Sequence, residues 1–152
     1  MASQFALPQI PNHFRFEFDP VNKILRARLE GRFTEEALKE LCEAARKYST
    51  ATDARAGILD LSLVTEFAVS AESIRQLAEQ EPAVMDASRP RIVVAPSPVG
   101  FGLVRMFQIM GEPTRPLLRV ERSMDDAFAA LGIQSPRFEL LESCPGNTGT
   151  KS

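Results

Sequence analysis

The stretch Gly57-Ile58-Leu59-Asp60-Leu61 decides the fold class of this chain. Its nearly continuous run of apolar side chains is typical of a strand that is buried on both faces, as the strands of a parallel sheet are. A second run of the same kind, Arg91-Ile92-Val93-Val94-Ala95, follows later in the chain. Because a helix-like segment separates the two runs, the pattern predicts a strand–helix–strand crossover and an α/β protein.

An antiparallel hairpin is predicted before this central strand. Apolar and charged residues alternate over residues 14–19 and again over residues 25–30, which is the period of strands with one exposed face. Residues 20–23, Pro-Val-Asn-Lys, supply the turn that joins the two strands.

Four segments carry the start signal of a helix, a hydroxyl residue that can accept a hydrogen bond from the first turn. These predicted N-cap residues are Thr34, Ser70, Ser97 and Ser123. The second helix must end near Pro82, while Gly111 and Gly132 end the third and fourth. A last strand is expected over residues 117–121, so the element order is β-β-α-β-α-β-α-β-α. The sequence therefore predicts an α/β fold with a single mixed, mostly parallel five-stranded sheet and four helices.

The length and composition fit one globular domain. The 152 residues are 44% hydrophobic and 25% charged, which provides enough apolar material for a single core. We expect an N-terminal extension over residues 1–13, the domain over residues 14–133 and a C-terminal tail over residues 134–152. The tail is expected to be partly disordered, because it is polar and glycine-rich from Ser143 onward.

Charge and hydropathy exclude several classes of partner. The formal net charge of -2, from 18 basic and 20 acidic residues, does not favour binding to the phosphate backbone of nucleic acids. No apolar run approaches the ~20 residues that span a bilayer, and residues 1–12 lack the features of a secretory signal, so a cytoplasmic protein is expected. The two cysteines, Cys42 and Cys144, are too few for a disulfide framework.

Residues that carry chemistry are sparse, so we expect no catalytic site, no metal, no cofactor and no enzyme activity. His13 is the single histidine and lies outside the predicted core elements. Asp125 and Asp126 fall in the first turn of a helix, where the helix dipole favours acids in any case. Asp60 ends a central strand, where α/β sheets bind ligands, although a lone aspartate there commonly hydrogen-bonds the next turn. The loop over residues 95–102 lacks the third glycine of a dinucleotide site and the lysine of a P-loop.

Three stretches, in this order, resemble the STAS domain family, the fold of the bacterial anti-sigma-factor antagonists that is also found on anion transporters. Residues 29–33 followed by a helix resemble the family's passage from the second strand through Gly-Arg into the first helix. Residues 58–65 resemble its third strand and the turn that follows, and residues 118–131 resemble its C-terminal strand and helix. Residues 91–112 are similar to a STAS-like bacterial group of unknown function that is related to both STAS and lipid-binding CRAL-TRIO domains.

The resemblance implies a non-catalytic module that signals through contacts with other proteins. In this family a phosphorylatable serine in an Asp-Ser-Ser-Gly motif starts the second helix. Ser70 stands at that place in Ala68-Val69-Ser70-Ala71, but the aspartate before it and the glycine after it are absent. Ser70 is therefore a candidate phosphosite, and a plain helix N-cap is the alternative interpretation.

The helix expected over residues 99–110 is apolar over much more of its circumference than packing on one sheet requires. Its glycine-containing start and its apolar side chains form a candidate ligand or partner surface: Gly100, Phe101, Gly102, Leu103, Met106, Phe107 and Met110. A deeply buried core helix is the alternative interpretation.

Two functional hypotheses follow from these features. The first is a non-catalytic regulatory module that binds another protein, or a second copy of itself as a homodimer. The second is a small carrier or sensor of an apolar, lipid-like ligand.

Overall fold

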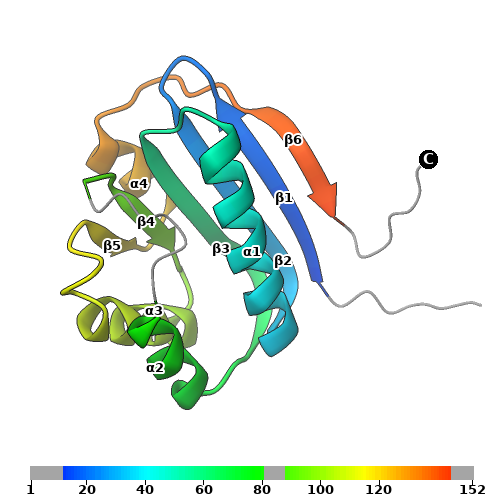
Figure 1. Cartoon of the computed structure of the whole chain (residues 1–152), viewed down its shortest axis with the longest axis vertical. Coiled ribbons are helices and arrows are strands. Elements are labelled where there is room, and N and C mark those ends of the chain that lie inside the picture. Colours follow the sequence, from blue (N-terminus) through cyan, green and yellow to red (C-terminus); the bar gives the residue numbers. More distant parts are fainter. Residues whose placement is uncertain (1–11, 81–87, 145–152) are drawn as a thin grey trace, which may run out of the picture.

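The computed structural model describes residues 12–80 and 88–144 of the chain (Figure 1). The elements follow one another in chain order as β1 (Asn12–Asp19), β2 (Ile24–Thr34), α1 (Glu35–Ala51), β3 (Ala56–Ala68), α2 (Ala71–Glu79), β4 (Arg91–Val94), α3 (Pro98–Met110), β5 (Leu118–Glu121), α4 (Met124–Leu131) and β6 (Glu139–Cys144).

The strands form one sheet in the order β5-β4-β3-β2-β1-β6. Strands β2 to β5 run parallel to one another, whereas β1 is antiparallel to both of its neighbours, β2 and β6. The predicted fold class, a single mixed sheet with four helices, is confirmed. The predicted count of five strands is wrong, because the described part of the chain forms a 6-stranded sheet.

The additional strand, β6, lies at the edge of the sheet beside β1, so β1 is not an edge strand. Its sequence shows no period-two pattern, because its two leucines, Leu140 and Leu141, are adjacent and both are exposed. The segment before β6 is held instead by Asp19, whose carboxylate accepts a hydrogen bond of 2.9 Å from the backbone N–H of Arg137. β6 lies within the segment predicted as a C-terminal tail, while residues 1–11 and 145–152 lie outside the described residues.

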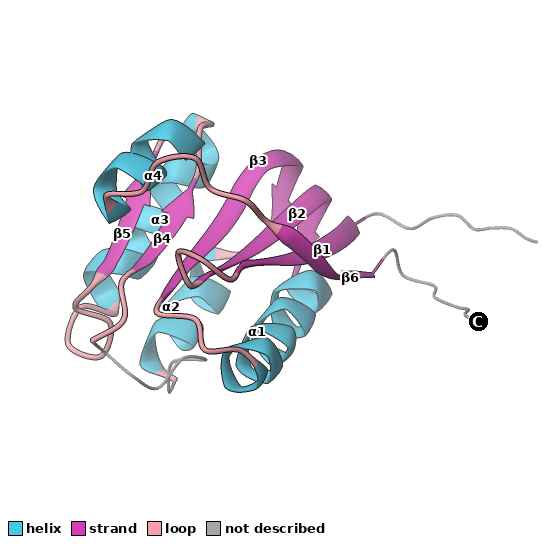
Figure 2. Cartoon of the chain, turned by 90° about the horizontal axis from the view of Figure 1, so that it is seen from above, coloured by secondary structure: helices cyan, strands magenta, loops and turns pink. Residues whose placement is uncertain are grey.

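Helices cover both faces of the sheet, with α1 and α4 on opposite sides (Figure 2). On the side of α1, apolar side chains of β1 and β2 pack against α1 and against Val104 and Phe107 of α3. On the side of α4, three isoleucines of successive strands, Ile24, Ile58 and Ile92, pack against that helix. α2 packs against α3. The sheet therefore has an apolar cluster on each face.

The helix boundaries follow the predicted start and stop signals. Each of the four predicted N-cap hydroxyls accepts a hydrogen bond from a backbone N–H in the first turn of its helix. After α4, Gly132 adopts the left-handed conformation with φ of 69°, and the N–H of Ile133 donates to the carbonyl of Phe128 over 3.0 Å. This is a Schellman turn, which ends the helix at the predicted Gly132, and Ile133 packs beside α4.

Candidate functional site

Helix α3, the predicted ligand or partner surface, is not a deeply buried core helix. Among its residues only Gly100 is buried, while Val99 is 63% exposed and Ile109 is 60% exposed. Val104 and Phe107 supply its contact with the core. The interpretation as a fully packed helix is therefore wrong, because the excess apolar side chains reach solvent.

The start of α3 meets the end of β3 at a very close contact. A Cβ atom added to Gly100 would lie 2.5 Å from Cζ of Phe67, so only glycine allows the helix to approach this ring. Phe101 lies beneath the guanidinium of Arg122, at 4.0 Å from its ring centre. Gly102, by contrast, is exposed and has open space around it.

Ser70, the candidate phosphosite, lies three residues after Phe67 at the start of α2 and is exposed. Its hydroxyl accepts a hydrogen bond of 3.0 Å from the N–H of Ser73, so the N-cap interpretation is confirmed. The carboxylate of Glu35, at the start of α1, accepts a bond of 3.1 Å from the N–H of Ser70 itself. An anionic group already lies against the amino end of α2 before any modification.

These observations bring two of the predicted features to one corner of the molecule. The corner consists of the end of β3, the start of α2 at Ser70 and the start of α3 at Val99 and Gly100, joined by Phe67. We call this the α2–α3 corner. The remaining predicted residues of α3 lie further along the helix, and Met110 at its end is 39% exposed.

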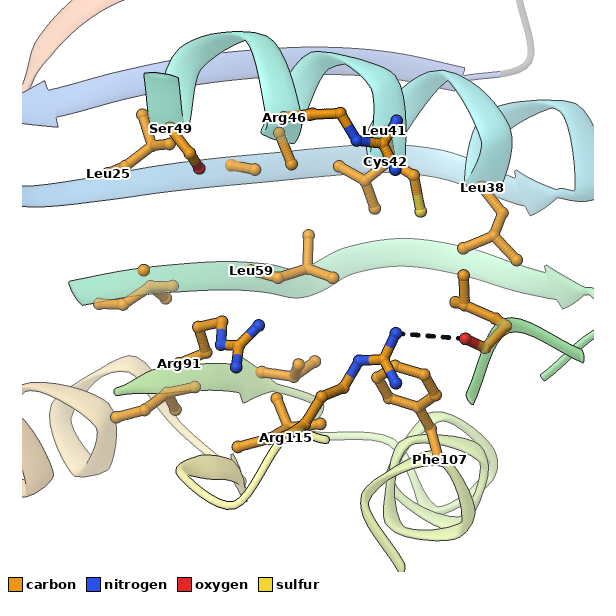
Figure 3. A pocket seen from close by; sticks show the side chains of 18 of the residues that line it. Leu25, Leu38, Leu41, Cys42, Arg46, Ser49, Leu59, Arg91, Phe107 and Arg115 are labelled. Carbon is orange, nitrogen blue, oxygen red and sulfur yellow. Dashed lines mark hydrogen bonds between the residues drawn. The ribbon is translucent and has the colours of Figure 1, made fainter. Parts of the chain in front are cut away.

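A second site, which the sequence did not predict, lies between α1 and the sheet. A cavity of about 210 Å³ opens there between α1, the end of α2 and strands β2 to β4 (Figure 3). Apolar side chains form most of its wall, including Leu25, Leu41, Leu59, Val93 and Phe107. Of the predicted α3 surface, Phe107 alone is among the described residues that line it.

Three arginines line this cavity, namely Arg46, Arg91 and Arg115. Figure 3 shows Arg46 coming from α1 on one side, with Arg91 and Arg115 lying near each other on the opposite side. None of the described residues that line the cavity is acidic. The cavity is thus mainly apolar, and a neighbouring pocket that shares Cys42 and Arg46 with it is also lined by Glu35, Glu36 and Glu43.

Arg115 is the most buried of these cations, at 5% exposed. Its guanidinium donates to the backbone carbonyls of Leu77, Ala78 and Gln80, at 3.2, 3.0 and 3.1 Å, and therefore caps the end of α2. It also donates to the hydroxyl of Thr114 and lies 4.8 Å from the ring centre of Phe107. These partners satisfy its hydrogen bonds but carry no formal negative charge.

The titratable groups of the cavity reflect this environment. Burial, together with the neighbouring charge of Arg91, lowers the pKa of the Arg115 guanidinium, which remains protonated at all ordinary pH. Burial raises the pKa of the Cys42 thiol, while the charges of Arg46 and Arg115 act in the opposite direction. Cys42 therefore lines the same cavity as these arginines, and the charges of Arg46 and Arg115 act on its thiol.

The opposite face of the sheet carries charges that are paired. Arg26 and Arg28 of β2 alternate with core residues that point toward α1, so their own side chains point the other way. Three pairs of residues that lie opposite each other in the strand register form ion pairs: Arg26–Glu17 at 2.9 Å, Arg28–Asp60 at 3.1 Å and Arg32–Glu66 at 3.0 Å.

The other candidate residues do not form a reactive site. Asp60 is buried, and it accepts bonds from Arg28 and from the N–H and hydroxyl of Ser62, the local role expected for it. Asp125 and Asp126 are exposed acids in the first turn of α4. The backbone of His13 pairs with Glu30 in the hairpin. Within residues 12–80 and 88–144, no three acidic, cysteine or histidine residues gather as a metal site would require.

Sequence reasoning missed the cavity because its lining comes from distant segments. Arg115 lies in a proline-flanked loop, Pro113-Thr114-Arg115-Pro116, that carries no recognised motif. In the sequence, Cys42 and Arg46 are ordinary positions of an amphipathic helix, the first half-buried and the second exposed. The space itself depends on how far α1 lies from α2 and α3 on the sheet. No local pattern encodes that distance.

Comparison with known proteins places the fold. No family model matches the chain, and no curated protein matches it. The anti-sigma-factor antagonist SpoIIAA in its unphosphorylated form superposes with a TM-score of 0.55 at 13% identity, over 80% of this chain and 99% of that one. An anti-sigma-factor antagonist from Mycobacterium paratuberculosis superposes with a TM-score of 0.57 at 16% identity, over 80% of this chain and 95% of that one.

A third solved structure is the Bacillus cell-fate determinant SpoIIAA in its phosphorylated form. It gives a TM-score of 0.51 at 14% identity and covers 78% of this chain and 98% of that one. Among the described residues, no helix is both long and apolar enough to cross a membrane. The sheet order, the helix positions and these superpositions together show that the chain has the STAS-like fold of the anti-sigma-factor antagonists.

Proposed function

We propose that this chain is a non-catalytic regulatory module that acts in the bacterial cytoplasm by binding a partner protein through the α2–α3 corner. The observation that carries the proposal is that Val99, which is 63% exposed, and the exposed Ser70 flank the Gly100–Phe67 contact in sequence, on a fold shared with anti-sigma-factor antagonists. By analogy with those proteins, the proposed partner is an anti-sigma factor.

The corner has the composition of a small protein-binding surface. Ser97, Pro98 and Val99 are all exposed and belong to the first turn of α3 or its cap. The Gly100–Phe67 contact fixes this turn against the end of β3, so the surface is rigid rather than adaptable. A preorganised surface of this kind loses little conformational entropy when a partner binds.

In this proposal Ser70 is the regulated position of the surface. A phosphate on Ser70 would compete with the Glu35 carboxylate for the free N–H groups at the start of α2. Glu72, in the first turn of α2, adds a second negative charge nearby. Phosphorylation would therefore displace the Glu35 contact and change the surface that the partner meets.

The second hypothesis, a carrier of a lipid-like ligand, receives no support from the superposed proteins, which are anti-sigma-factor antagonists.

The test compares two exposed valines. A photo-crosslinking residue at Val99 should capture a specific partner in the native host, whereas one at Val21, which is 81% exposed in the β1–β2 turn, should not. Val99→Glu should then abolish co-purification of the captured protein while Val21→Glu preserves it. Equal capture at both positions, or capture of the chain by itself alone, would contradict the proposal.

Regulation at Ser70 has its own test. Intact-mass measurement of the protein from its native host, with Ser70→Ala as the control, should show one phosphate that the variant lacks. A Ser70→Asp variant should bind the captured partner more weakly than wild type. If the native protein carries no phosphate under any growth condition, the regulatory part of the proposal fails while partner binding stands.

A further inference from the structure

Two glycines of α3 differ in what the fold requires of them. Gly100 is needed by this chain itself, because a Cβ atom there would lie 2.5 Å from Cζ of Phe67. A Cβ atom on Gly102 would meet nothing within 4 Å beyond its chain neighbours and the backbone of its own helix. A glycine inside a helix is less stable than an alanine, because its backbone loses more freedom on folding. Nothing in the described part of the chain therefore requires a glycine at position 102.

Gly102 lies in the middle of an apolar stripe that α3 turns toward solvent. With 3.6 residues per turn, Val99, Gly102, Met106 and Ile109 fall on one face of the helix. Val99, Gly102 and Ile109 are exposed and Met106 is half-buried, whereas Val104 points from another side of α3 into the core. We call the first four residues the α3 stripe.

A glycine at the centre of such a stripe allows a second helix to lie unusually close. The axes of packed helices are about 8–10 Å apart, and the side chains at the contact set the value. At Gly102 the backbone of a second helix can approach to the short end of this range, with Val99 and Met106 packed on either side of the crossing. A membrane surface makes no such demand, because a larger apolar side chain there would only add buried area.

One flank of the α3 stripe carries two arginines. Arg105 donates through Nη1 to Oε1 of Gln108 over 2.7 Å, and Gln108 is itself fixed by a bond of 2.9 Å to the carbonyl of Leu118 in β5. Arg122 lies over the ring of Phe101, at 4.0 Å from the ring centre. Among the described residues neither arginine forms an ion pair, so both can bind a carboxylate of another molecule.

The acids of the neighbouring elements do not pair with these two arginines. The acids that pair with other arginines are Glu72, Glu79 and Glu121. Asp125 and Asp126 belong to α4, which packs on the opposite face of the sheet from α3. Glu112 follows the end of α3 and is exposed. The flank therefore favours a partner with acidic side chains.

We propose that the α3 stripe binds an amphipathic helix of the partner protein, which crosses α3 at Gly102 and directs acidic side chains toward Arg105 and Arg122. The inference deepens the proposed function and rests on it, because the same partner contacts Val99 at the α2–α3 corner. A second copy of the chain fits less well. In an antiparallel pair of stripes the arginines of both copies would lie on the same side and repel each other.

Substitution of Gly102 separates docking from folding. Gly102→Ala should raise the midpoint of thermal unfolding by about 2–4 °C, because alanine is the better helix former and open space surrounds this position. The same methyl group should weaken binding of the purified protein captured at Val99 by about tenfold or more in calorimetric titrations. Gly102→Leu should abolish binding, and the control Ala130→Leu, at an exposed position of α4, should leave it unchanged.

The outcomes distinguish this inference from the proposed function. If Gly102→Ala binds the partner as tightly as wild type does, no backbone lies close to this position and the inference is wrong, while partner binding at Val99 stands. If Val99 captures no protein, the proposed function fails and the inference fails with it.

Crosslink positions test whether the bound segment is a helix. Photo-crosslinking residues at Val99, Met106 and Ile109 should attach to partner residues at i, i+3, i+4 or i+7 spacing, as a helix that lies along the stripe would present them. Attachment at every second residue would identify a strand, and attachment to unrelated segments would identify no single element. Either result would contradict the proposed helix.

The arginine flank has its own test. Arg105→Gln should weaken partner binding about threefold to tenfold, with a smaller difference at 1 M salt. Its control, Arg55→Gln, removes an exposed arginine that precedes β3. Equal weakening by the two variants would show a general effect of net charge, and the proposed acidic character of the partner helix would be wrong.

Two further measurements address the other possible occupants of the stripe. The wild-type chain should be monomeric in size-exclusion chromatography with light scattering, and it should not float with vesicles of phosphatidylcholine and phosphatidylglycerol. Vesicle binding that Gly102→Leu strengthens would identify a membrane surface, and a dimer that Gly102→Leu dissociates would identify a second copy. Either result would overturn the proposal.

Discussion

Arginines on the two faces of the sheet have different kinds of hydrogen-bond partner. On the face toward α4, arginines of β2 project from a regular strand and meet carboxylates at the directly opposite positions of β1 and β3. On the face toward α1, Arg115 arrives from a loop and is held by the carbonyls at the end of α2. Strand register thus supplies counter-charges on one face, while on the other face Arg115 satisfies its hydrogen bonds with neutral oxygens.

This difference shows that a satisfied hydrogen-bond network and a neutralised charge are separate properties. The ion pairs of β2 stabilise the register of the hairpin and the central strand and leave little local field. The carbonyl-bound guanidinium stabilises α2 but leaves a field that extends into an apolar cavity, where the low local dielectric strengthens it. The following variants test each side of this contrast, in order of decreasing effect.

Replacement of Arg115 should have the largest effect on stability. Arg115→Met removes the donor that holds three backbone carbonyls at the end of α2, and we expect the free energy of unfolding to fall by about 2–4 kcal/mol. Urea unfolding measures this change, and amide exchange should accelerate near residues 77–80. Arg119→Met is the control, because Arg119 is 58% exposed beside Glu121. If both variants lose the same free energy of unfolding, the hydrogen bonds from Arg115 to the carbonyls of α2 do not stabilise the fold.

On the paired face, the buried carboxylate of Asp60 should matter most. Asp60→Asn leaves the guanidinium of Arg28 without its anion, and we expect a loss of about 1–3 kcal/mol in the free energy of unfolding. The control is Asp53→Asn, at an exposed ion pair with Lys23, which should leave the unfolding midpoint unchanged within error. If Asp60→Asn leaves the free energy of unfolding unchanged, Ser62 and the strand register stabilise this region without the ion pair.

Asp19 is the anionic counterpart of Arg115, since among the described residues it is held by N–H groups alone. Burial by itself would raise the pKa of this carboxyl, but hydrogen bonds from Asn22, Arg137 and Val21 together lower the pKa below the ordinary value of 3.8. The folded state therefore binds a proton less readily than the unfolded state. The resulting stability is fully present above the ordinary value and is lost as the pH falls through the lower pKa of the folded protein.

The variant Asp19→Asn should consequently be less stable than wild type by about 1–2 kcal/mol at neutral pH, with a difference that shrinks as the pH approaches 2. Urea unfolding at a series of pH values measures both quantities. Stability curves that remain parallel down to low pH would show that the Asp19 carboxylate is not preferentially ionised in the folded protein.

The smallest effect is expected at the outer ion pair of the charged face. Arg32 and Glu66 are 48% and 57% exposed, so solvent and salt screen their attraction. Arg32→Gln should change the free energy of unfolding by less than about 0.5 kcal/mol, and the change should vanish at 1 M salt. A larger loss in the free energy of unfolding that persists at 1 M salt would indicate that this ion pair stabilises the strand register.

The sequence was sufficient for the elements whose signals are local. Ser97 followed by Pro98 predicts the start of α3, Gly132 predicts the end of α4, and the apolar runs predict β3 and β4, because caps, turns and buried strands each depend on a few neighbouring residues. β6 was not predicted, because its leucines face solvent. The segment before it is held by the hydrogen bond between Arg137 and Asp19, which are 118 residues apart in the sequence.

The candidate sites were predictable only in part, for the same reason. Ser70 was identifiable because an N-cap is a local signal, and Phe107 was identifiable because helix periodicity is local. The approach of Gly100 to Phe67 and the meeting of Arg46, Arg91 and Arg115 at one cavity depend on crossover geometry and loop length. These long-range relationships have no signature in a single sequence.

The place of β6 has a consequence for the order in which the protein is made. β1 leaves the ribosome before the other described strands and β6 after them, so one side of β1 lacks its neighbour until the residues of β6 have been synthesised. Contacts between such distant segments form slowly, and an open strand edge invites pairing with other chains in the meantime. Nascent chains that stall before residue 139 would leave this side of β1 open to pairing with other chains.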